Sequence, residues 1–118
     1  MANLNDSLEQ LMSADAALCA ALVDSSSGML LGSAGSGLDM ELAAAGNTEV
    51  VRAKYKTMAL LGLNDAIDDI LITLGTQYHI IRPVSSQAGL FLYLVLDKKG
   101  NLALARRKMQ DVEQKLEI

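Results

Sequence analysis

The single histidine and the single cysteine limit the catalytic and metal chemistry open to this chain. A Ser-His-Asp or Cys-His mechanism would have to use His79, which lies in an apolar, strand-like run, and the serines at 25–27 have no Gly-x-Ser-x-Gly motif around them. Cys19 lies inside another apolar run, without a basic neighbour that would lower the pKa of its thiol. Together they cannot supply the ligand set of a structural zinc site. We therefore expect a structural, half-exposed histidine, an inert buried thiol, no metal and no catalytic residue.

Two other groups of residues resemble parts of active sites. The segment 32–37, Gly-Ser-Ala-Gly-Ser-Gly, precedes a predicted helix as a phosphate-binding loop would. However, Met40 stands where the dinucleotide-binding motif requires glycine, and no Gly-Lys-Ser/Thr motif follows. Asp68 and Asp69 are adjacent, so in a strand their carboxylates point to opposite faces, which does not suit shared acid–base work. We interpret the glycines as a connector and the carboxylates as charge at a strand end, and we expect no cofactor.

Length and composition indicate one globular domain over residues 1–118. The chain is 51% hydrophobic and 20% charged, which allows a substantial core and argues against intrinsic disorder. Its 10 basic and 14 acidic residues give a net charge of −4, so nucleic-acid binding is disfavoured. No apolar stretch is long enough for a membrane span, and the N-terminus does not read as a secretory signal. Because a lone cysteine forms no internal disulfide, we expect a reducing, cytoplasmic setting.

Hydrophobic periodicity predicts the elements that position these residues. In the first half, a helix is expected over about 3–12, a β-hairpin over 17–32 with its turn at 24–28, and a long helix over 39–61 that Gly62 ends in a left-handed conformation. In the second half, strands at 69–74 and 77–82 flank Gly75-Thr76, which predicts a type II′ hairpin. The apolar run 90–96 is expected to be a central strand, and a one-faced helix begins near 102.

The resulting order is α-β-β-α-β-β-β-α, which predicts the α+β class. We expect a five-stranded antiparallel sheet with the long helix on one face and the two terminal helices on the other. Within the long helix, Gly46 and its alanine neighbours are unusually small. Since glycine costs a helix about 1 kcal/mol relative to alanine, Gly46 is either tolerated at a poorly packed position or needed where a second backbone approaches.

Several hydrophobic strings resemble the Roadblock/dynein-light-chain family, in its bacterial or archaeal single-domain type. They are residues 70–75 with 78–83, residues 90–97 with 101–107, and residues 20–24 with Gly28-Met29. The resemblance covers nearly the whole chain and keeps the order of its elements. It implies a profilin-like fold and a homodimer in which the long helix crosses its symmetry mate and the third strands pair edge to edge. It also implies a non-catalytic module that binds or regulates a small Ras-like GTPase.

On this basis we predict two sets of site residues. Small residues of the long helix and apolar residues of an otherwise hazardous edge strand form the expected dimer interface, namely Ala43, Ala44, Gly46, Val50, Ile70, Ile72 and Leu74. The charged group Glu49, Arg52, Lys54 and Lys56 is either a solvated face or the surface that docks the GTPase. Two other functions stay open: an adaptor or scaffold without nucleotide dependence, and a small-molecule sensor with a pocket between the long helix and the sheet.

Overall fold

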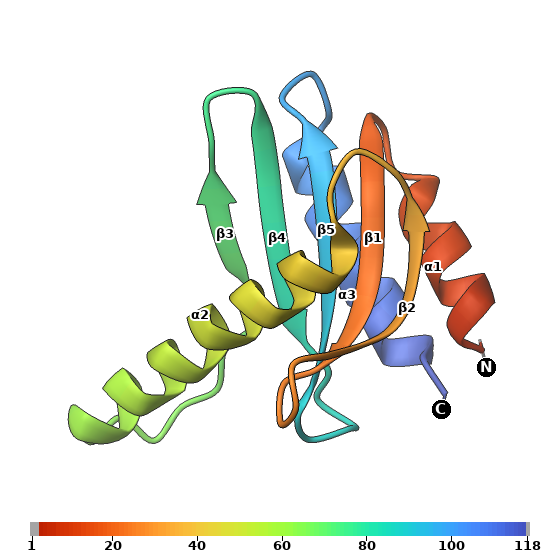
Figure 1. The fold of residues 1–118 in the computed structure, drawn as a ribbon. Coiled ribbons are helices and arrows are strands. Elements are labelled where there is room, and N and C mark those ends of the chain that lie inside the picture. Colours follow the sequence, from red (N-terminus) through yellow and green to blue (C-terminus); the bar gives the residue numbers. More distant parts are fainter. Residues whose placement is uncertain (1–2, 118) are drawn as a thin grey trace.

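The computed structural model describes residues 3–117, and its three helices and five strands follow the predicted order (Figure 1). They are α1 (Leu4–Met12), β1 (Ala17–Asp24), β2 (Met29–Gly35), α2 (Met40–Leu60), β3 (Ile70–Thr73), β4 (Gln77–Pro83), β5 (Leu90–Asp97) and α3 (Leu102–Lys115). None of the helices in this part of the chain is both long and apolar enough to cross a membrane.

The strands form one antiparallel sheet in the order β2-β1-β5-β4-β3. The most hydrophobic run, β5, is the central strand, as predicted, and six of its eight residues are buried. The hairpins β1–β2 and β3–β4 lie on either side of β5, so β2 and β3 are the two edges of the sheet.

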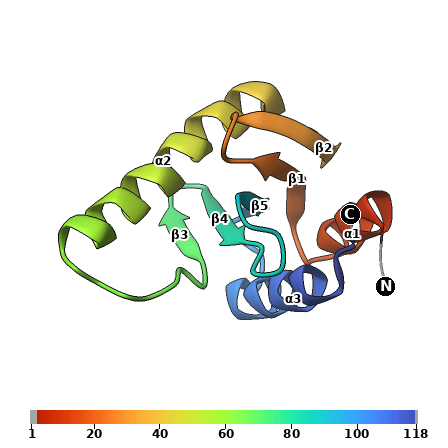
Figure 2. The same ribbon diagram turned by 90° about the horizontal axis from the view of Figure 1, so that it is seen from below.

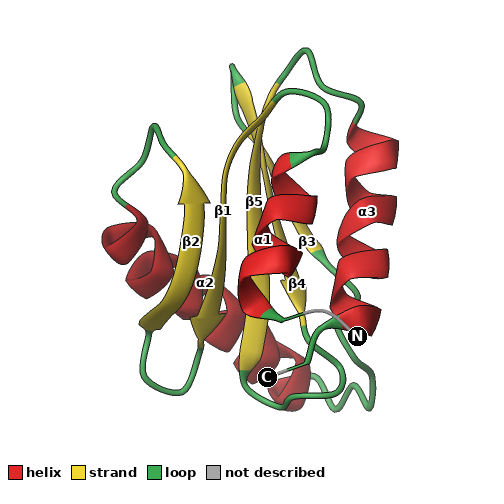
Figure 3. Cartoon of the chain, turned by 90° about the vertical axis from the view of Figure 1, so that its right-hand side faces the viewer, coloured by secondary structure: helices red, strands yellow, loops and turns green. Residues whose placement is uncertain are grey.

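Each face of the sheet carries its own hydrophobic core. On one face, α2 packs over β1 and the centre of the sheet, and Ala44 and Val51 contact a cluster that includes Ile81, Phe91 and Tyr93. On the other face, α1 and α3 cover a second cluster formed by alternate residues of the same strands. Figures 2 and 3 show α1 and α3 together on one side of the sheet and α2 on the other, which confirms the predicted layers.

The first four residues of the glycine-rich segment, 32–35, belong to strand β2 and not to a connector, which corrects our interpretation for this part, whereas residues 36 and 37 do lie in the connection to α2. β2 extends through Gly35, and α1 lies directly over Gly32, where a Cβ atom would come within 2.8 Å of Leu4 Cδ2. At Gly35 the backbone has a φ of +82°, and a Cβ atom would approach the Leu18 carbonyl oxygen to 2.3 Å. Glycine is therefore required at position 35 by its backbone conformation and by close packing against β1, whereas a side chain at position 32 would displace the Leu4 side chain of α1.

The turns around α2 and β3 give one confirmation and one correction. Gly62 follows α2 with a φ of +71°, so the predicted left-handed end of the long helix is confirmed. Gly75 lacks the positive φ that a type II′ turn requires at this position, so that predicted turn type is wrong.

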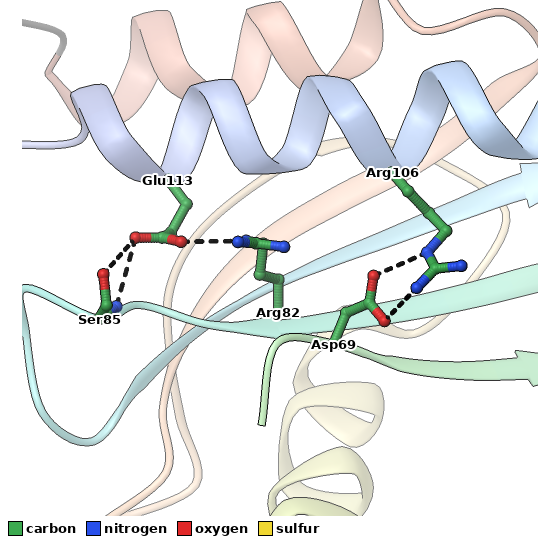
Figure 4. A network of polar contacts seen from close by, with 5 residues as sticks. All are labelled: Asp69, Arg82, Ser85, Arg106 and Glu113. Carbon is green, nitrogen blue, oxygen red and sulfur yellow. Dashed lines mark hydrogen bonds and ion pairs between the residues drawn. The ribbon is translucent and has the colours of Figure 1, made fainter. Parts of the chain in front are cut away.

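Two ion pairs tie α3 to the β3–β4 half of the sheet (Figure 4). Arg106 donates two hydrogen bonds of 2.8 Å to the carboxylate of Asp69, just before β3. Arg82 Nε donates to Glu113 Oε1 at 3.0 Å, and the backbone and hydroxyl of Ser85 donate to Glu113 Oε2 at 3.3 and 2.8 Å. Because Arg82 and Glu113 are both largely buried, the attraction between the two charges is needed to offset the free-energy cost of removing each of them from water.

Replacing Glu113 with alanine should therefore destabilise the fold. The substitution leaves the Arg82 charge and the Ser85 donors without their acceptor, so we expect a loss of about 3 kcal/mol in the free energy of unfolding, measured by urea denaturation. Asp111→Ala, on the exposed side of the same helix, is the matched control and should change stability by less than about 0.5 kcal/mol. Equal stabilities of the two variants would contradict this account of the Glu113 network.

Candidate interaction surface

Only one side of α2 is covered by the rest of the chain. Its buried residues Ala44, Thr48, Val51 and Met58 recur at spacings of 4, 3 and 7, so they share the side that faces the sheet. The hydroxyl of Thr48 is satisfied within the helix, since it donates to the Ala44 carbonyl oxygen at 2.7 Å. The remaining sides of this helix have no partner among residues 3–117 that buries them.

α2 is longer than the sheet beneath it is wide. Its 21 residues span about 32 Å, whereas the outer strands of a five-stranded sheet are about 19 Å apart. Figures 1 and 2 show the C-terminal half of α2 running past β3, beyond the edge of the sheet. Its end presents Leu60 and Leu61 to solvent, with 78% and 65% of their surfaces exposed. Part of an apolar helix is therefore left uncovered.

A large apolar hollow lies between this overhanging half of α2 and the segment that leads into β3. Its volume is about 820 Å³. The apolar side chains in its wall include Val50 and Met58 from α2, and Leu63, Ile67 and Ile70 from the following segment. Lys54 lines it from α2, and Asp65, Asp68 and Asp69 line it from the other side.

A second hollow, of about 310 Å³, lies between the N-terminal half of α2 and β4 and β5. It is lined by Leu38, Asp39, Leu42, Ala43, Gly46, Asn47, His79 and Tyr93. Ala43, Asn47, Val50, Lys54 and Thr57 recur at spacings of 4, 3, 4 and 3, so one side of α2 borders both hollows. We call the two hollows together the side groove.

Gly46 lies in the side groove, and its own chain does not require a glycine there. A Cβ atom at Gly46 would meet nothing within 4 Å, in contrast to Gly32 under α1. The position is therefore open, so packing within the monomer does not explain the small residue.

The two edges of the sheet differ in how well they are protected. β2 carries a register shift opposite Leu22 and Val23, and both α1 and α2 pack against it. β3 pairs with β4 in unbroken register and consists of Ile70, Leu71, Ile72 and Thr73. A bulged and covered edge strand pairs poorly with a strand of another chain, whereas the unpaired backbone groups of a regular apolar edge can form such a pair. β3 is therefore the edge available for pairing with another chain.

Most of the predicted interface residues lie along the side groove or on β3. Ala43, Gly46, Val50 and Ile70 line the groove. Ile72 is half-buried on β3, and Leu74, just beyond the strand, is 43% exposed. Ala44 differs, because its side chain is 2% exposed and packs in the core beneath α2. Its place in the predicted interface is therefore withdrawn: it shares the sheet-facing side of the helix with Val51.

The predicted docking residues do not form one group. Lys54 lines the side groove, whereas Glu49, Arg52 and Lys56 are exposed on the opposite flank of α2 and do not line either hollow. The helical period explains the separation, since positions 49, 52 and 56 follow each other at spacings of 3 and 4 and position 54 does not fit that row. We call Glu49, Arg52 and Lys56 the charged flank.

Sequence reasoning treated His79 as an isolated structural residue and missed its partners. The Tyr93 hydroxyl lies 2.7 Å from His79 Nδ1, and Gln77 Oε1 lies 2.9 Å from His79 Nε2. The His79 and Tyr93 rings pack edge to face with centroids 5.6 Å apart. Alternation along the two strands would have placed Gln77, His79 and Tyr93 on one face, but only with the β4–β5 register known. Burial lowers the pKa of His79 and raises the pKa of the Cys19 thiol.

Neither the polar cluster nor the carboxylates form a metal site in the described residues. Among residues 3–117, no three His, Cys, Asp or Glu side chains are grouped so that they could hold a metal ion.

Comparison with known proteins defines the class of fold. No family model and no curated protein sequence matches the chain. Among solved structures, Myxococcus xanthus MglB is similar over 94% of this chain and 89% of its own, with a TM-score of 0.83 and 22% identity. A Roadblock/LC7 domain from Streptomyces avermitilis is similar over 97% of this chain and 94% of its own, with a TM-score of 0.83 and 12% identity. The chain thus has the Roadblock/LC7 fold, which confirms the predicted resemblance at the level of fold.

A third neighbour has the same fold with a lower similarity. Myxococcus xanthus MglC is similar over 94% of this chain and 93% of its own, at 16% identity and a lower TM-score of 0.64. A further similar structure, MglB with a tetrameric arrangement, covers 94% of this chain and 82% of its own with a TM-score of 0.81 and 16% identity.

The unprotected β3 edge predicts self-association that a single charge should weaken. Wild-type chain should sediment as a dimer at micromolar concentration, whereas Leu74→Lys should raise the dimer dissociation constant at least about tenfold, since lysine at an edge opposes strand pairing. Leu104→Lys replaces an equally apolar side chain, 64% exposed on α3, and should leave association unchanged. A 12.6 kDa wild-type species at these concentrations, or equal effects of both lysines, would contradict the assignment of β3.

Proposed function

We propose that this chain is a non-enzymatic, homodimeric interaction module that binds and regulates a small Ras-like GTPase. The observation that carries the dimer is the continuity between the side groove and the free β3 edge, since Ile70 belongs to both. The GTPase is what the Roadblock resemblance implies, and the exposed charged flank offers a surface for it.

A two-fold axis perpendicular to the sheet at the outer edge of β3, between this strand and its symmetry mate, suits these surfaces. It pairs β3 with its symmetry mate in antiparallel fashion and places both α2 helices on the same face of a continuous sheet. Each helix end that overhangs its own sheet then extends over the partner's sheet. The uncovered side of each α2 faces the other helix, and Ala43 and Gly46 allow the two backbones to approach closely. Both exposed features are buried by one symmetric contact.

The charged flank stays accessible in such a dimer, because it lies on the side of α2 away from the groove. Glu49, Arg52 and Lys56 carry a net charge of +1 and would be presented twice, on the same face of the dimer. To regulate a GTPase, the dimer has to bind one nucleotide state of it more tightly than the other, since only differential affinity shifts an equilibrium.

A specific observation also supports the small-molecule sensor as a second candidate. A hollow of about 530 Å³ lies at the end of the sheet, between α2 and α3, and includes Val51, Tyr55, Arg82 and Phe91 in its wall. The predicted pocket between the long helix and the sheet therefore has a counterpart here. A ligand of this hollow would raise the melting temperature of the chain, and the rise would grow with the logarithm of ligand concentration above the dissociation constant.

Gly46→Leu tests the dimer from the helix side. The substitution should leave the monomer fold intact, because the new side chain enters open space, and should raise the dimer dissociation constant at least about tenfold by separating the two helices. Sedimentation equilibrium measures the association, and circular dichroism checks the fold. An unchanged dimer constant would place the interface elsewhere on the molecule.

State-dependent binding tests the GTPase proposal and separates it from a scaffold. We expect the dimer to bind a candidate small Ras-like GTPase at least about tenfold more tightly in one of two states, loaded with GDP or with a non-hydrolysable GTP analogue, measured by calorimetry. Arg52→Glu should weaken the tighter complex, whereas Arg107→Glu, on the exposed surface of α3, should not. Equal affinity for both states would favour the scaffold.

A further inference from the structure

Two neighbours on the α2 side of the sheet lie within hydrogen-bond distance of the two ring nitrogens of His79. Since Oε1 of Gln77 can only accept a hydrogen bond, Nε2 of His79 carries the proton, and Nδ1 accepts from the Tyr93 hydroxyl. Both hydrogen bonds are therefore satisfied by the neutral imidazole. The charged ring would bring a second proton to Nδ1, so the Tyr93 hydroxyl would have to rotate and accept there instead of donating.

His79 lies beside the proposed dimer interface. It is paired with Ile72 of the edge strand β3 on one side and with Val95 of β5 on the other. It also lines the N-terminal hollow of the side groove, together with Leu42, Ala43 and Gly46. Its ring is half-buried in the monomer, and a second α2 helix seated in the groove would remove most of its remaining water.

We propose that His79 is a pH-sensitive element of the self-association surface, so that the dimer forms with neutral His79 and loosens when the imidazole is protonated. The inference rests on the proposed homodimer and adds its regulation. It assigns to the chain's only histidine a role that the GTPase proposal does not use.

The other titratable groups that face this site do not replace His79 in that role. Asp39 lines the same hollow from the start of α2, where its carboxylate accepts a hydrogen bond from the Leu42 backbone. Asp97 lies two register pairs beyond Val95 along β5, opposite Gln77. Tyr93 touches the ring directly, and the buried Cys19 lies in the same cluster beneath α2. Burial raises the pKa of the Tyr93 hydroxyl and of the Cys19 thiol above their ordinary values, which already lie above neutral pH.

The sign of the effect follows from proton linkage. Burial already lowers the pKa of His79 below its ordinary value in the monomer, and further burial in the dimer lowers the pKa again. The monomers then bind more protons than the dimer in the range between the two pKa values, so association is favoured as pH rises and opposed as it falls. Above the ordinary histidine pKa of about 6.5, both forms are neutral and the dependence disappears.

Sedimentation equilibrium of the full chain at pH 7.5 and pH 5.5 tests the proposal. We expect the dimer dissociation constant of the wild type to rise at least about tenfold at the lower pH, since each subunit contributes up to tenfold for every unit by which dimerisation lowers its pKa. His79→Gln keeps a polar, uncharged side chain and should reduce this change to about twofold or less. Circular dichroism at both pH values verifies that the fold is retained.

A second readout uses the single histidine directly. In proton NMR the His79 ring should titrate with a midpoint below about 6.5, and the midpoint should fall further as protein concentration is raised through the dimerisation range. Three results would overturn the role of His79 without affecting the proposed dimer. They are a wild-type dissociation constant that is the same at both pH values, a titration midpoint that does not depend on protein concentration, and an equal pH response in His79→Gln. A chain that stays monomeric at pH 7.5 would instead overturn the proposed function itself.

Discussion

The feature on which the rest of this structure depends is a mismatch between one helix and the sheet that carries it. α2 buries a single row of residues, Ala44, Thr48, Val51 and Met58, and then continues past β3 with apolar side chains in water. The strand beneath this overhang is a regular apolar edge. The exposed apolar area of α2 can be buried, and the free edge of β3 can be paired, only when another chain binds. Both features therefore favour association over the lone chain. The one symmetric contact that we propose would bury both, which is why we treat them as one surface.

The opposite half of the molecule is complete without a partner. α1 packs closely over Gly32 and Gly35, and the edge strand β2 is bulged and covered. The buried pair of Glu113 and Arg82 connects α3 to β4. Arg106 and Asp69 connect α3 to the start of β3. This asymmetry assigns different roles to the two faces: the α1–α3 face stabilises the fold, and the α2 face is available for contact. The polar cluster of His79 and Tyr93 lies on the second face, where a change in protonation can affect association.

The sequence predicted the order of elements and the layers because hydrophobic periodicity reports directly on burial, as in the continuous run of β5 and the one-faced helix α3. It also predicted β3 as an edge strand. It misassigned residues 32–35, since glycines that allow close packing of α1 have the same composition as a flexible connector. It grouped Lys54 with Arg52 and placed Ala44 in the interface, because the face of α2 that meets the sheet was not known. The partners of His79 depend on strand register, which local patterns do not determine.

Hydrogen–deuterium exchange as a function of protein concentration tests most directly whether a second copy covers the side groove and the β3 edge. We expect the amides of residues 43–57 and 70–74 to become protected from exchange as protein concentration rises, because the second copy covers them. The amides of the other edge strand, β2, should exchange at a rate that does not depend on concentration. The proposed interface would be contradicted if exchange at β3 and α2 did not change with concentration, or if protection appeared at β2 instead.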